Sequence, residues 1–281
     1  MRLFKYLHPD RIDVIKGKQI SFSPPQNLND PFELKPPIHE GEFLKLARDY
    51  SREELDKLTD KKIRETYTPQ EIKSLGRDRI AHIKFQYRKC LMAAAKHYLP
   101  DINSALHNAT QRSVGVLCLS EKQDDILMWA HYTNAHEGFV LEFDPGNSFF
   151  DSRRSKNDEC RYLRKMIYSD QRPLLSHKST ADMSAFLTKS THWEYEREWR
   201  MMVDINDSTD TIVMPHQKIH LFAFPSEAII SITIGCRASE KTIKEIYSTL
   251  ANDEDLKKVP VFQASADKLQ FRLNITEAIR P

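Results

Sequence analysis

Acidic residues and an arginine alternate with aromatic and apolar residues between Trp193 and Val203. If this segment is extended, its side chains point alternately to two faces, and one face carries Glu194, Glu196, Glu198 and Arg200. Carboxylates crowded on one face perturb one another's pKa values, as they do in many active sites. We therefore predict a catalytic carboxylate here, with Arg200 compensating part of the charge. The structural alternative is a polar strand edge whose acids pair with Arg197, Arg200 or surface lysines.

A second group of residues suited to a site lies between Val114 and Asp144. The apolar run Val114–Leu119 is typical of a buried strand, and Phe139–Asp144 alternates like another. Between them, a short helix is predicted over Asp125–Thr133, with Ser120 to Gln123 as its capping segment. Its apolar face would hold Ile126, Trp129, Ala130 and Thr133, and its opposite face Asp125, His131 and Tyr132.

The first residues of the chain add a third set of polar side chains. Residues 2–7 are predicted to form a strand that contains Lys5 and Tyr6, and a short helix closed by Gly17 and a strand at 19–23 are expected to follow. The loop after them, 24–33, is dense in proline, asparagine and aspartate, so we expect a defined backbone that presents Asn29.

The fold class predicted from these patterns is α+β. Capping boxes at Ser51 and Thr68, followed by apolar residues at spacings of three and four from Ile80 to Tyr98, predict helices between 40 and 110. Elsewhere, helices are predicted at 180–192 and 239–251, and strands at 163–168, 219–224, 229–234, 259–263 and 269–273. We therefore expect one sheet-centred domain over residues 1–281, with a helical insertion at 40–110.

Composition limits the classes of partner. The 42 basic and 40 acidic residues nearly cancel, so the chain has no global charge that would hold nucleic acid or an anionic membrane. Neither a P-loop nor a GxGxxG motif occurs, which argues against the P-loop NTPases and the Rossmann oxidoreductases. The four cysteines fit no zinc pattern, and no run of eighteen apolar residues occurs, so a cytoplasmic protein without a membrane segment is expected. The sequence leaves assembly into a homo-oligomer open.

Three segments resemble a prokaryotic family known only as domain of unknown function 2971. They are Leu3–Tyr6 together with Leu28–Glu33, then Leu119–Glu121 together with Asp125–Tyr132, and Trp193–Arg200. The family carries no assigned activity. The resemblance to this family implies that the protein is an effector used in conflict with phage or with competing cells.

The order of elements also resembles, more distantly, the ADP-ribosyltransferase fold with its split sheet. The opening strand at Phe4-Lys5-Tyr6, the glycine-containing strand at Val114–Leu117 and the helical Tyr132 would correspond to its substrate-binding elements. Glu196 or Glu198 would be the catalytic glutamate, and Lys5 or Tyr6 occupies the position where such enzymes carry histidine or arginine. The resemblance implies NAD as substrate and an acceptor that is a protein or a nucleic acid.

In that chemistry, a carboxylate stabilises the oxocarbenium-like state that forms when the bond between nicotinamide and ribose breaks. Tyr132 would stack on the nicotinamide, Lys5 and Asn29 would hold the diphosphate or the carboxamide, and Tyr6 and Arg200 would complete the dinucleotide-binding set. A neighbouring acid, Glu194 or Glu196, would orient the acceptor. This mechanism needs no metal.

Two other classes of function remain open from the sequence. In a metal-dependent nuclease or hydrolase, Asp30, Glu33 and the acids at 194–198 would bind Mg²⁺, although no recognised metal spacing occurs. In a non-catalytic interaction module, the acids would be paired structurally and the helical insertion would dock a protein partner.

Overall fold

The computed structural model describes residues 1–50, 52–176, 183–215 and 217–279, which form an α+β fold. Within these residues, the largest sheet has eight strands in the order β13-β12-β11-β4-β1-β3-β8-β5. The bounds of these strands are β1 Leu3–Leu7, β3 Val114–Ser120, β4 Phe139–Phe143, β5 Leu163–Lys165, β8 Glu198–Asp204, β11 Ile229–Ile234, β12 Val261–Ala266 and β13 Leu273–Glu277. Neighbours pair antiparallel except β11 with β12.

Two smaller sheets accompany the large one in the described residues. The first has the order β2-β10-β9, with β2 at Gln19–Phe22, β9 at Asp210–Met214 and β10 at Gln217–Ala223. A single bridge between Ser23 and Val116 joins it to β3 of the large sheet. The second is the parallel pair β6 (Ile167–Tyr168) and β7 (Thr188–Lys189). Beyond the bridge at Ser23, β2 pairs with β10.

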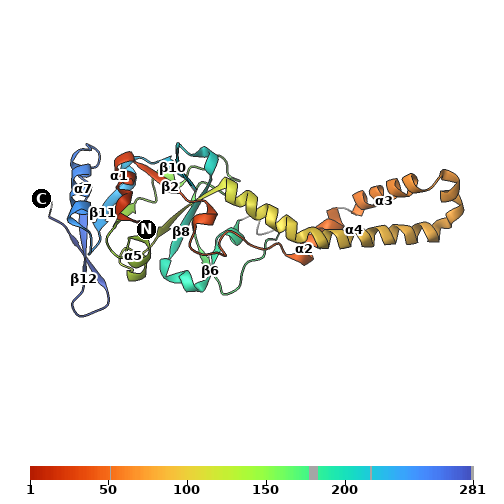
Figure 1. Ribbon diagram of the computed structural model, residues 1–281, viewed down its shortest axis with the longest axis horizontal. Coiled ribbons are helices and arrows are strands. Elements are labelled where there is room, and N and C mark those ends of the chain that lie inside the picture. Colours follow the sequence, from red (N-terminus) through yellow and green to blue (C-terminus); the bar gives the residue numbers. More distant parts are fainter. Residues whose placement is uncertain (51, 177–182, 216, 280–281) are drawn as a thin grey trace. The chain divides into compact units, whose positions relative to one another are not determined.

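The chain divides into two compact units, of which the first holds all three sheets and consists of residues 1–34, 110–172 and 186–281. Helices α1 (Asp13–Gly17), α5 (Ile126–Tyr132) and α7 (Glu240–Ala251) belong to it, and Figure 1 shows α7 beside β11 and β12. The apolar side of α7 repeats at three and four residues through Ile243, Ile246, Tyr247 and Leu250, which explains its packing against the core. Strand β4 lies between β1 and β11, and it is buried at every position.

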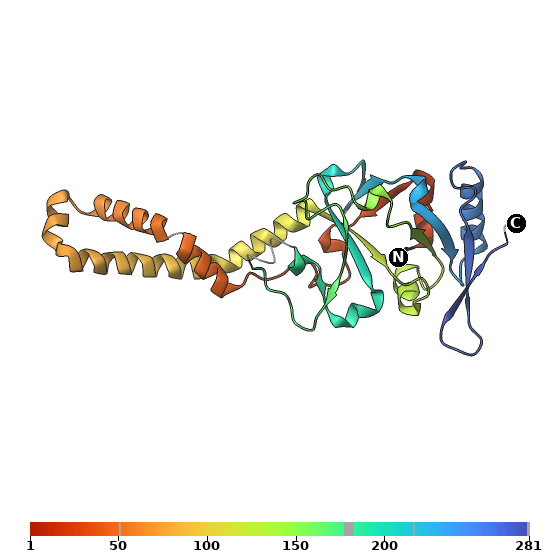
Figure 2. The ribbon, with the colours of Figure 1, turned by 180° about the vertical axis from the view of Figure 1, so that it is seen from behind.

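The second unit, residues 35–109 and 173–185, contains α2 (Glu40–Tyr50), α3 (Arg52–Thr66) and most of α4 (Pro69–Ser113). Figures 1 and 2 agree that α3 runs back alongside α4. The pairs Lys84–Asp60 and Arg88–Asp56 connect these two helices. The capping box predicted at Thr68 is confirmed, since Glu71 accepts from the Thr68 backbone N–H at 2.7 Å. The box predicted at Ser51 lies outside the described residues.

Several predicted elements were wrong in position or type. The helix at 180–192 is not formed over its described part, where a 3-10 turn at Ser184–Phe186 and strand β7 occur instead. Residues 191–196 form a 3-10 helix rather than the start of an extended strand, because Ser190 caps the turn. Helix α5 is capped by Asp125 and not by Ser120, and it buries Met128 and Trp129 while Ile126 and Ala130 are exposed. Helix α1 ends with Lys18, not Gly17, in the left-handed conformation.

None of the helices in the described part of the chain combines the length and the apolar character that a bilayer crossing requires.

Candidate functional site

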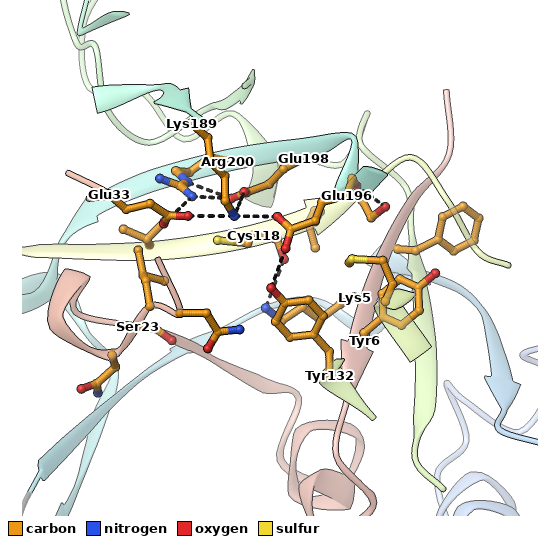
Figure 3. Close-up of a pocket in the computed structure, with 18 residues that line it drawn as sticks. Lys5, Tyr6, Ser23, Glu33, Cys118, Tyr132, Lys189, Glu196, Glu198 and Arg200 are labelled. Atoms are coloured by element: carbon orange, nitrogen blue, oxygen red, sulfur yellow. Dashed lines mark hydrogen bonds and ion pairs between the residues drawn. The ribbon is translucent and has the colours of Figure 1, made fainter. Parts of the chain in front are cut away.

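A cavity of about 240 Å³ opens between the large sheet and the loop after β2, and it lies wholly within the first unit. Strands β1, β3 and β8 form its floor, α5 and the loop after β2 form its sides, and Figure 3 shows its side chains. Aromatic and charged groups converge there. The lining residues are Phe4, Lys5, Tyr6, Ser23, Asn27, Leu28, Asn29, Glu33, Val116, Cys118, Leu119, Ser120, Met128, Tyr132, Lys189, Glu196, Glu198 and Arg200.

The ammonium group of Lys189 lies at the centre of a buried ionic cluster (Figure 3). Its Nζ is 2.7 Å from Glu33 Oε1, 2.6 Å from Glu196 Oε2 and 3.1 Å from Glu198 Oε2. Burial opposes ionisation of this lysine, but the three carboxylates outweigh it and raise its pKa. Lys189 therefore stays charged and fixes Glu33 of the loop after β2 beside Glu196 and Glu198, which are distant from it in sequence.

Arg200 closes the other side of the same cluster. Its Nη2 is 3.0 Å from Glu33 Oε2 and 2.7 Å from Glu198 Oε1, and its Nε donates to Glu198 Oε1 at 2.8 Å. Burial penalises ionised Glu198, but the charges of Arg200 and Lys189 and a hydrogen bond from the Cys118 thiol lower its pKa to about 2. Glu198 is therefore ionised at neutral pH and paired with two cations.

Glu196 differs from Glu198 in its electrostatics. Burial, which is its largest influence, raises the pKa of Glu196 despite the attraction of Lys189, and the charge of Glu198 adds to the rise. Tyr132 donates its hydroxyl to Glu196 Oε1 at 2.6 Å, and the Ser120 hydroxyl donates to the Glu196 carbonyl at 2.6 Å. A carboxylate with a raised pKa that is oriented from two sides is suited to accepting a proton or to stabilising positive charge.

Hydrogen-bond donors line the opposite side of the cavity. Lys5 Nζ donates to the Cys118 carbonyl at 3.1 Å, and burial lowers its pKa although Glu198 and Glu196 oppose the change. Asn29 lines the same cavity and lies close enough to Tyr132 to influence its hydroxyl. The Tyr6 hydroxyl is directed at the segment after β3, where it donates to the Lys122 carbonyl at 2.7 Å. The Tyr6 ring packs edge-on against Trp129.

The structure brings together seven of the eight site residues predicted from the sequence. Glu196, Glu198, Arg200, Tyr132, Asn29, Lys5 and Tyr6 all line the cavity, whereas Glu194 is exposed and does not. The sequence reasoning missed Lys189, because it assigned that residue to a helix, and Cys118, because it considered the cysteines only as zinc ligands. Glu33 was considered only as a metal ligand. The signal that could have found Lys189 was the surplus of three acids over one arginine, which requires another cation.

The same contacts bear on metal binding. Among the residues that the structure describes, no three histidine, cysteine or acidic side chains are placed to hold a metal ion together. The carboxylates of Glu33, Glu196 and Glu198 do converge, but the point of convergence is filled by Lys189 Nζ.

Comparison with known proteins gives one match. A family model described as "Protein of unknown function (DUF2971)" matches residues 128–201. This segment contains Tyr132 of α5 and continues through Lys189 and Glu196 to Glu198 and Arg200, so it includes the ionic cluster except for Glu33. No curated protein and no solved structure matches the chain.

Proposed function

We propose that this protein is an ADP-ribosyltransferase-like enzyme or an NAD glycohydrolase, and that the cavity binds the nicotinamide and ribose part of the dinucleotide. The observation that carries the proposal is the position of Glu196, whose carboxylate lines the cavity and is held between the Tyr132 hydroxyl and Lys189. The divergence of β2 from β3 beside the cavity supports the resemblance to a split sheet. An effector role in conflict with phage or competitors is part of the same proposal.

The size and lining of the cavity support a small flat ligand group. About 240 Å³ is less than the roughly 300 Å³ at which pockets for drug-sized ligands begin, so the cavity suits one half of a dinucleotide. Aromatic rings of Phe4 and Tyr132 border this space and offer faces to a cationic ring. Lys5 and Asn29 supply donors for the carboxamide or a phosphate oxygen.

In the proposed reaction, the bond between the nicotinamide nitrogen and ribose C1′ breaks, and both bonding electrons leave with the nicotinamide. The oxocarbenium-like ribose that remains is stabilised by the carboxylate of Glu196. Water, or a hydroxyl, amine or thiol of an acceptor, then bonds to C1′ and loses a proton. Glu196 is the proton acceptor, because its pKa is raised, whereas that of Glu198 is lowered to about 2.

The test is release of nicotinamide from NAD by the purified protein, with and without a cell extract that supplies acceptors. We expect release by the natural sequence and a loss of at least 100-fold in Glu196→Gln. Glu194→Gln is the matched control, because Glu194 is exposed outside the cavity and its removal should leave the rate within about two-fold. Dependence on the extract would identify a transferase, and independence a glycohydrolase. Equal rates in the two variants would refute the assignment of Glu196.

A non-catalytic binding module is the second candidate, and one observation favours it. Each carboxylate of the cluster already has a cationic partner within the protein, as a purely structural network would have. Thermal unfolding with added NAD separates the two candidates, because a ligand that binds the folded state at 100 times its Kd stabilises it by about 2.7 kcal/mol. No shift with NAD and no nicotinamide release would favour the binding module.

A further inference from the structure

A second depression, a groove of about 1070 Å³, adjoins the cavity within the first unit. Phe4 lines both, so the groove and the cavity meet at this residue. One wall is the segment after β3, from Glu121 to Asp124, and the other is the β12–β13 hairpin, the dark blue hairpin beside the C-terminus in Figure 2. Four successive residues of β13, from Leu273 to Thr276, line this wall. Since alternate side chains of a strand point to opposite faces, a wall made of successive residues includes the edge of the strand itself.

The backbone of β13 has hydrogen-bonding groups directed away from its neighbour. Strand β13 is the last strand of the large sheet and pairs antiparallel with β12 alone among the described strands. At the two ends of this pairing, Asp267 N–H donates to the Arg272 carbonyl and Ala278 N–H to the Val261 carbonyl. Backbone groups of successive residues alternate in an antiparallel ladder, so positions 272, 274, 276 and 278 face β12. The N–H and C=O groups of Leu273, Ile275 and Glu277 therefore face outward.

Exposed apolar side chains continue this wall at the tip of the hairpin. Leu269 and Phe271 are 94% and 102% exposed, and Met1, which lines the groove, is 66% exposed. Large apolar side chains gathered at one place on a surface mark sites of protein interaction.

The charges along the groove favour a polypeptide over a nucleic acid. Arg2, Lys122 and Arg272 are accompanied by the acidic residues Glu121 and Asp124. Moreover, Arg2 is paired with Glu142, and Arg272 with Asp267. A phosphate backbone is held by a field of one sign, which this arrangement does not provide. An extended peptide needs main-chain partners on an edge strand and apolar contacts, both of which are present.

We propose that this groove binds an extended segment of a protein substrate, which pairs with the outer edge of β13 as an additional strand. The adjoining position of the groove would bring side chains of the bound segment to the mouth of the cavity at Phe4. The role of this segment as acceptor of the transferred group rests on the function proposed above. The binding of the segment to the groove does not depend on that function.

The probe is a peptide selected from a displayed library of random twelve-residue sequences against the full chain, then synthesised with a fluorescent label. Its Kd is measured by anisotropy, without NAD, for the natural sequence, Ile275→Pro and Ile275→Val. Proline removes an N–H that faces outward and leaves those that bond to β12, and edge strands tolerate it at such positions. We expect Ile275→Pro to weaken binding at least ten-fold and Ile275→Val to stay within about two-fold. Hydrogen exchange of the natural protein should show new protection at Leu273, Ile275 and Glu277 when the peptide is added.

Each result of these measurements either supports or overturns peptide binding at β13. If Ile275→Pro fails to fold, the exchange measurement on the natural protein decides. Failure to select a peptide, equal affinities in the two variants, or protection confined to another part of the chain would overturn the proposal. A dimer that Ile275→Pro converts to a monomer would show that a second copy of the chain occupies the edge, which also overturns it. Peptide binding at β13 without any nicotinamide release would retain the groove and reject the enzyme.

Discussion

Lys189 stabilises the site by balancing three carboxylates that would otherwise repel one another in a buried place. Its side chain and those of Glu33, Glu196 and Glu198 are all 5% exposed or less. Removing one partner of a buried ion pair leaves charges that neither water nor protein compensates, and this costs more than the intact pair contributes. The cluster therefore depends on Lys189, whose charge cannot be removed without cost to the carboxylates around it.

We predict that Lys189→Met lowers the free energy of unfolding by about 3 to 5 kcal/mol. Methionine is close to lysine in size, so the loss reports mainly the missing charge. The measurement is urea unfolding at pH 7, with Lys165→Met as the control. Lys165 is 54% exposed and pairs with Glu121 at the surface, so its loss should cost less than about 1 kcal/mol. Similar losses in the two variants would contradict the central position of Lys189.

Glu198 should make stability depend on pH in the acid range. Its pKa is about 2 in the folded protein and about 4.3 in an unfolded chain, so its contribution is complete above the unfolded value and is lost as the pH falls towards 2. Between pH 6 and pH 3 this loss amounts to about 2 kcal/mol. Urea unfolding at several pH values should show a weaker acid dependence in Glu198→Gln than in the natural sequence.

Glu196 should act in the opposite sense. Its pKa is raised, so its ionisation destabilises the folded protein as the pH rises above the unfolded value. A Glu196→Gln variant whose acid dependence also became weaker would show that the roles of the two glutamates are reversed.

At the scale of elements, α5 and the turn after it orient Tyr132 towards Glu196, and the turn depends on a close approach at Gly138. A Cβ atom at Gly138 would lie 2.0 Å from the Leu7 carbonyl oxygen, closer than any real contact. The position precedes β4, which pairs along its whole length with β1. Any side chain at 138 must therefore displace the end of β1 or the turn that supports α5.

We predict that Gly138→Ala destabilises the protein by at least about 1 to 3 kcal/mol, the range for overpacked cores. Gly17→Ala is the control, because the nearest atom to its added Cβ is 3.8 Å away in a flexible side chain and alanine favours the last turn of α1. Thermal unfolding of the two variants measures the difference. Equal melting temperatures would mean that the turn adapts to a larger residue at no cost.

Elements with a regular period were predictable from the sequence. The strands at β1, β2, β3, β4 and β11 and the helix α7 were predicted close to their observed positions, because each is a regular run packed against one core. The final strand was placed too early, at 269–273. The side chain of Asp267 accepts from the backbone N–H groups of Leu269 and Gln270, which makes these residues a turn, and β13 starts only at Leu273.

The cluster itself was only partly predictable, because its geometry depends on residues distant in sequence. The alternation from Glu194 to Arg200 predicted that Glu196, Glu198 and Arg200 lie together, and they do. The extended conformation on which this prediction depended is wrong for residues 191–196. Those residues form a 3-10 helix, and Arg197 in the left-handed conformation then redirects the chain into β8. The spacing of Met183, Phe186 and Leu187 imitates a helix, so the sequence concealed β7 and with it Lys189. Nothing local indicates that Glu33 lies beside Arg200.

At the scale of the whole molecule, the two units differ in how much side-chain surface they bury. The first unit contains the cavity, the groove and the large core cluster that spans β1, β3, β4 and β11. In the second unit, the residues between 56 and 98 include only two whose side chains are described as buried, Thr59 and Ile63. Opening of a segment is easy where few apolar contacts are buried.

We therefore predict that amide hydrogen exchange distinguishes the two units in the intact protein. The amides of β1, β3, β4 and β11 should exchange only through global unfolding, because they lie in the interior of the sheet and most of their side chains are buried. Amides between residues 56 and 98 should exchange at least about 100-fold faster, since the helices there open by breaking hydrogen bonds that few buried contacts reinforce. Mass spectrometry of peptic fragments over a day measures both sets. Equal protection would contradict this expectation, because it would mean that α3 and α4 unfold together with the sheet as one cooperative unit.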